Sequence, residues 1–103
     1  MSQKLLKIAE IDRINPGQML RVMADNKAIL LANIEGRYYA IADQCSHEDA
    51  SLYNGALKGD CVECPLHGSH FSFKTGEPQQ EPATEAIATY AVVEKEDGIY
   101  LNI

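Results

Sequence analysis

The chain lacks several features that would indicate common functions. It contains no Gly-x-Gly motif, so the glycine-rich fingerprint of NAD- and FAD-binding folds is missing. Basic residues are few: 9 lysines and arginines stand against 15 acidic residues, which gives a formal net charge of −6. Such a surface repels phosphate backbones, and we therefore expect no nucleic acid among the partners.

Long apolar runs are also missing. No segment approaches the roughly 18 consecutive apolar residues of a transmembrane helix, and the first residues lack the apolar run of a signal peptide. Cysteine is scarce, and its count of three is odd, whereas secreted domains stapled by disulfides usually carry an even number. Three cysteines are also too few for an iron–sulfur cluster held by four thiolates. We expect a protein of the cytoplasm that does not associate with membranes.

What the sequence does contain is a series of short strand patterns. Its 103 residues suffice for a single domain, residues 1–103, with one modest core. Apolar runs separated by turn residues predict β-strands, and the last of them alternates apolar with polar side chains. The predicted strands cover residues 5–8, 19–23, 28–34, 37–41, 87–93 and 99–103. The pattern predicts an all-β fold of antiparallel strands.

The segment from about residue 43 to 75 differs from its β-rich flanks. It holds all three cysteines and all three histidines of the chain. Only residues 51–54 look weakly helical, and the rest is predicted as loops around a short strand at 60–63. Loops of this length in a small domain usually bind something or carry function.

The cysteines and histidines of this segment form two matching pairs. Cys45-x-His47 is followed, after sixteen residues, by Cys64-x-x-His67. Two thiolates and two imidazoles could hold a single zinc ion, although Cys-x-His is a tight spacing for two ligands of one ion. The spacing is natural if each loop sends its cysteine to one iron and its histidine to another.

This pattern resembles the signature of the Rieske family, C-x-H followed by C-x-x-H. Further matches are Gly68 after the last histidine, Phe71 two residues after Ser69, and Thr75-Gly76 at the end of the second loop. The whole chain is similar to the ferredoxin components of bacterial ring-hydroxylating dioxygenase systems. The resemblance implies a Rieske fold, with a sandwich-like antiparallel base (residues 1–42 and 76–103) and an inserted cluster-binding subdomain (about 43–75).

The resemblance also implies the cofactor and its ligands. One 2Fe–2S cluster would be bound by Cys45 and Cys64 at the inner iron and by His47 and His67 at the outer iron, near solvent. The chain would carry single electrons from an NAD(P)H-dependent flavoprotein reductase to a terminal oxygenase that attacks aromatic rings, and would act as a monomer. Because only one histidine remains for any separate iron site, the chain is not expected to be an enzyme.

Two alternatives remain open at this point. One is a structural zinc module used for protein interaction. The other is a protein similar to the small subunits of assimilatory nitrite reductases, which share the fold but often lack the cluster ligands.

Four neighbouring residues need separate interpretations. Cys61 would extend the motif to a run with period three, but its place in a short strand favours a buried apolar thiol. His70 lies outside the signature, and we predict a surface role near the cluster. Glu48 and Asp49 flank the first motif and would either mark a docking face or be ordinary solvated residues.

The sequence departs from the high-potential members of the Rieske family. Those members join the two loops by a disulfide, whereas the corresponding positions here are Ala50 and Leu66. They also place a serine and a tyrosine hydroxyl near the sulfurs, and here Ser69 matches the first but Phe71 replaces the second. Fewer hydrogen bonds to sulfur predict a reduction potential of about −150 mV, low for a Rieske centre.

Overall fold

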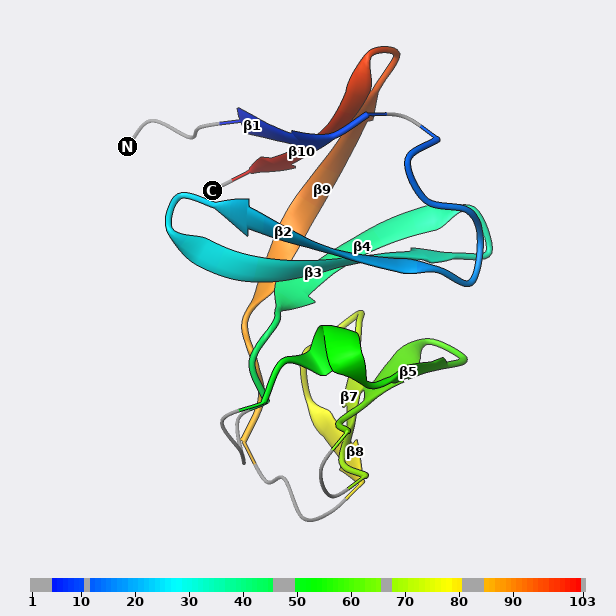
Figure 1. Ribbon diagram of the computed structural model, residues 1–103, viewed down its shortest axis with the longest axis vertical. Coiled ribbons are helices and arrows are strands. Elements are labelled where there is room, and N and C mark those ends of the chain that lie inside the picture. Colours follow the sequence, from blue (N-terminus) through cyan, green and yellow to red (C-terminus); the bar gives the residue numbers. More distant parts are fainter. Residues whose placement is uncertain (1–4, 11, 46–49, 66–67, 81–84, 103) are drawn as a thin grey trace.

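The computed structural model describes residues 5–10, 12–45, 50–65, 68–80 and 85–102. Six strands form one antiparallel sheet in the order β1-β10-β9-β4-β3-β2. The sheet is so strongly curled that its two edge strands, β1 and β2, approach each other (Figure 1). The strand bounds are Leu5–Ala9 (β1), Met19–Ala24 (β2), Lys27–Ile34 (β3), Arg37–Ala42 (β4), Thr89–Lys95 (β9) and Gly98–Asn102 (β10).

A second, smaller sheet lies on one side of this base. Its four short antiparallel strands have the order β5-β6-β7-β8, and a single 3₁₀ turn, η1, precedes them. Figure 1 shows this sheet and η1 at the opposite end of the molecule from β1 and β10. Within the described ranges, no helix has the length and hydropathy needed to cross a membrane. The bounds are Leu52–Asn54 (η1), Ala56–Lys58 (β5), Cys61–Glu63 (β6), His70–Ser72 (β7) and Pro78–Gln80 (β8).

The structure confirms the predicted all-β fold of antiparallel strands. The predicted strand at 87–93 begins two residues late, because the Ile87 N–H donates to the Gly76 carbonyl at 2.8 Å instead of joining the ladder. Strands β5 and β7 lie in the segment predicted as loops, and no strand was predicted at β8, since three residues are too few to show a period. The small sheet reaches Gln80, and the predicted subdomain boundaries near 43 and 75 stay a prediction.

Two tight hairpins set the register of the base. The β2–β3 turn consists of Asp25 and Asn26, with φ of 53° and 65°, and the β3–β4 turn of Glu35 and Gly36, with φ of 54° and 89°. Positive φ at both central residues is the type I′ geometry, whose twist matches that of the flanking strands. Short polar residues and glycine tolerate this geometry best, which explains why these positions punctuate the apolar runs.

Strand β3 is buried on both faces. Ile29 and Leu31 belong to a core enclosed by the curled sheet, together with Ile99 and Leu101. Leu30 and Ala32 point the other way, into a core shared with η1 and the small sheet. The continuous apolar run 28–34 is therefore the signature of a strand covered on both sides rather than of a half-exposed strand.

Candidate metal centre

Two of the four predicted ligands, Cys45 and Cys64, lie in the same core. Cys45 follows β4 and is 3% exposed, and Cys64 follows β6 and is 2% exposed. Both belong to the core that joins the base to the small sheet, where Val62 and Phe71 are fully buried. The fold therefore brings the two sulfurs, nineteen positions apart in the sequence, into one water-poor environment.

Each cysteine begins a loop that a backbone hydrogen bond closes. In the first loop, residues 45–50, the Cys45 N–H donates to the Ala50 carbonyl at 3.0 Å. In the second loop, residues 64–69, the Cys64 N–H donates to the Ser69 carbonyl at 2.7 Å. The two closures span the same number of residues, so the symmetry seen in the sequence motif extends to the backbone.

His47, His67, Glu48 and Asp49 lie outside the described residues. The assignment of the two histidines as ligands stays a prediction, as does the docking role of the two acidic residues. In the part of the chain that the structure describes, no three His, Cys, Asp or Glu side chains come together in a group that could hold a metal.

The described donors nevertheless fit an iron–sulfur cluster. All three cysteines are thiols in the structure. Two buried thiols, Cys45 and Cys64, each at the start of a separate loop, are of the donor type that iron–sulfur clusters require. Phe71 faces the core opposite Val62 and carries no hydroxyl, whereas Ser69 is fully buried.

Cys61 is not buried as predicted. It is partly exposed, because β6 alternates its side chains and directs Val62, not Cys61, into the core. Its Sγ lies 3.4 Å from Oδ1 of Asp60. The pKa of the Cys61 thiol is raised, mainly because the thiol is partly buried and also because of this hydrogen bond, and the thiol stays protonated at neutral pH. The structure thus points Cys61 away from Cys64 and its surroundings.

His70 pairs with Glu63 across the small sheet. The two residues lie directly opposite each other on β7 and β6, and Nε2 of His70 is 3.1 Å from Oε2 of Glu63. Both side chains are partly exposed. His70 is therefore a partly exposed residue, as predicted, and its partner Glu63 lies on β6, the strand that leads into the second loop.

Sequence reasoning missed Asp43, two residues before Cys45. Its carboxylate is 2% exposed and accepts hydrogen bonds from Arg21, Ser51 and the Tyr53 backbone N–H. The only signal in the sequence is a carboxylate at the end of an apolar strand, which by itself indicates a turn as readily as a buried anchor.

The chain matches the family described as Rieske [2Fe-2S] domain over residues 4–91. It is 35% identical to the ferredoxin component of biphenyl 2,3-dioxygenase from Rhodococcus jostii (strain RHA1), over 96% of this chain and 92% of that protein. It is 41% identical to the 3-phenylpropionate/cinnamic acid dioxygenase ferredoxin subunit of Escherichia coli (strain K12), over 84% of this chain and 82% of the relative.

A solved structure extends these similarities to three dimensions. A chain in the complex of reduced oxygenase and oxidized ferredoxin of carbazole 1,9a-dioxygenase superimposes with a TM-score of 0.89. The two chains are 33% identical, and the match covers 95% of this chain and 92% of that one.

Proposed function

The chain belongs to the family of Rieske [2Fe-2S] domains, and we propose that it carries single electrons from an NAD(P)H-dependent flavoprotein reductase to a terminal oxygenase that attacks aromatic rings. The relatives that support this are ferredoxin components of dioxygenase systems, matched over most of their length. The carbazole 1,9a-dioxygenase complex, which contains a ferredoxin together with its oxygenase, supports a terminal oxygenase as the partner. The carrier itself performs no chemistry on the substrate and is not an enzyme.

We assign Cys45 and Cys64 to the inner iron of one 2Fe–2S cluster and His47 and His67 to the outer iron. The observation that carries this assignment is the burial of both cysteines in one core, at the start of two loops of equal length. When bound, the cluster accepts and donates one electron. Two thiolates and two neutral imidazoles would leave the oxidised site without net charge, which favours uptake of an electron compared with four thiolates.

The acidic surface suits a carrier that meets two partners in turn. The net charge of −6 favours partners with basic docking faces, since opposite charges accelerate encounter. A carrier that must release one partner before it meets the next needs small, weakly bound interfaces. We infer a monomer in the cytoplasm, where NAD(P)H supplies the reductase.

Electron paramagnetic resonance of the reduced protein, with iron and sulfide counted per chain, tests the function. We expect two irons and two sulfides per chain, a red-brown oxidised protein, and a rhombic signal distinct from that of clusters held by four thiolates. A colourless protein with one zinc per chain would establish the zinc-module alternative instead. A chain that binds neither metal would favour the cluster-free alternative, similar to nitrite reductase small subunits.

The docking hypothesis predicts a charge-dependent rate. Changing Glu48 and Asp49 together to lysine should slow reduction by the reductase at least about tenfold at low ionic strength, and salt should diminish the difference. The measurement is stopped-flow reduction across a salt series. Changing Glu96 and Asp97 together to lysine is the matched control. This pair has the same two residue types as Glu48 and Asp49, but it lies in the turn between β9 and β10, at the end of the molecule far from the small sheet (Figure 1). Equal rates for the two lysine variants would reject the docking role.

A further inference from the structure

The carboxylate of Asp43 is a junction between the base and the first loop. Nε of Arg21, on β2, donates to Oδ2 of Asp43 at 2.8 Å. The backbone N–H of Tyr53, in η1, donates to Oδ1 at 2.9 Å, and the Ser51 hydroxyl donates to Oδ2. One buried side chain therefore holds together a base strand, the 3₁₀ turn and the chain that leaves the first loop.

The backbone of Asp43 takes part in the same junction. Its N–H donates to the Ala28 carbonyl at 3.0 Å, and its carbonyl accepts from the Leu52 N–H at 2.8 Å. Together with the Cys45–Ala50 bond, these contacts make residues 43–45 and 50–52 run antiparallel as a short neck beneath the first loop. The carboxylate accepts hydrogen bonds from Ser51 and Tyr53 on the opposite side of this neck, and its hydrogen bond from Arg21 connects the neck to β2.

The two loops differ in what supports their necks. The neck of the second loop consists of β6 and β7, which belong to a four-stranded sheet and are held by its ladder. The neck of the first loop contains a single isolated bridge, between Gln44 and Ser51. A neck this short needs side-chain bonds to hold one geometry, because backbone pairing alone leaves it marginal.

The charge of Asp43 is balanced by Arg21. A buried carboxylate is costly unless it is paired and hydrogen-bonded. The Arg21 side chain is 45% exposed, so the pair has one buried and one accessible member. Asp43 is two residues from Cys45 and contacts Arg21, so a change in either charge should alter the electrostatic potential at a cluster bound by Cys45.

We propose that Asp43 is a positioning residue for the cluster, which fixes the first loop so that Cys45 faces Cys64 in the geometry that the inner iron requires. Arg21 and Ser51 hold the Asp43 carboxylate in place. This inference rests on the proposed function, because it assumes that the two loops bind a cluster.

Three variants test the proposal: Arg21→Gln, Asp43→Asn and the double variant that combines them. Each should lose its cluster about tenfold faster than the wild type in the presence of an iron chelator, because each removes a charge-assisted hydrogen bond from the neck. The reduction potential should fall in Arg21→Gln, rise in Asp43→Asn, and return toward the wild-type value in the double variant. A positive charge favours the reduced cluster and a negative charge disfavours it.

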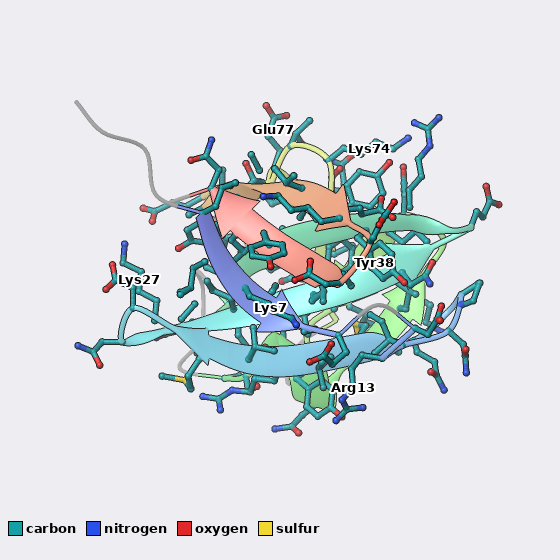
Figure 2. All side chains as sticks on the ribbon, turned by 90° about the horizontal axis from the view of Figure 1, so that it is seen from above. Lys7, Arg13, Lys27, Tyr38, Lys74 and Glu77 are labelled. Carbon is teal, nitrogen blue, oxygen red and sulfur yellow. The ribbon has the colours of Figure 1, made fainter. Side chains whose placement is uncertain are left out.

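Lys7→Gln provides the matched control. Lys7 forms an ion pair with Glu10 at 3.1 Å, and it lies on β1, on the face of the base remote from the small sheet (Figures 1 and 2). Its loss should change neither the rate of cluster loss nor the potential.

The possible failures can be told apart. A wild-type protein that takes up no iron and sulfide refutes the proposed function, whatever the variants do. A loaded wild type whose Arg21 and Asp43 variants keep the cluster as long as Lys7→Gln refutes the positioning role, even if their potentials shift. Faster loss combined with opposite shifts of the two single variants supports the role, since a general loss of stability would not move the potential in opposite directions. Faster loss with potentials that move in the same direction refutes it.

Discussion

Replacing Cys64 with alanine should reduce the iron and sulfide content of the purified protein to background. Cys64 is 2% exposed in the core that also holds Cys45. If both cysteines bind the inner iron as proposed, the loss of Cys64 would leave that iron with a single thiolate. Metal binding and folding of the ligand loops are coupled, so we also expect a less stable domain. Metal analysis and the visible absorption spectrum are the measurements, and His67→Ala should behave in the same way.

Cys61→Ser is the matched control for this experiment. Cys61 is the same residue type three positions earlier, but it lies on the other side of β6 from Val62 and its thiol contacts Asp60. The variant should keep the cluster at nearly full occupancy. A large loss of iron from Cys61→Ser would mean that the ligand assignment is wrong at that position.

Replacing Gly76 with alanine should destabilise the protein by at least about 2 kcal/mol. Gly76 has a φ of 76°, and a Cβ at this position would lie 2.1 Å from the Ile87 carbonyl oxygen. The backbone would have to move, and the 2.8 Å bond from the Ile87 N–H to the Gly76 carbonyl would be lost. Urea denaturation of the loaded protein measures the free energy of unfolding.

Gly36→Ala separates the two causes of this destabilisation. Gly36 has a φ of 89°, but a Cβ there meets nothing within 4 Å. Its substitution therefore reports the cost of the backbone conformation alone, about 1 kcal/mol. If both alanine variants unfold at the same denaturant concentration, the close contact between Gly76 and Ile87 makes no contribution.

Long strands and short ones differ in how far the sequence reveals them. The apolar run 28–34 and the alternation at 99–103 each extend over enough residues for a pattern to emerge, and both are strands in the structure. Strands β5, β7 and β8 have three residues each, and their pairing is decided by neighbours distant in the sequence. No local window contains that information.

In the candidate site, too, the sequence reveals features that depend on local spacing and hides those that depend on tertiary packing. Its two cysteines could be selected because the spacing of ligands along a loop is a local property of the chain. Cys61 was predicted to be buried because a cysteine in a short apolar strand usually is, but the side of β6 that faces the core depends on tertiary packing. Asp43 could not be recognised, since its partner Arg21 is 22 positions away and belongs to a different strand.

Because β3 presents one row of side chains to each of the two cores, the base and the small sheet are not separable modules. Excision of residues 43–75 would expose Leu30, Ala32 and Ile41 to water. The fragment 43–75 alone would lack the apolar side chains of the base against which it packs. We therefore expect the base and the small sheet to unfold together, in one cooperative transition.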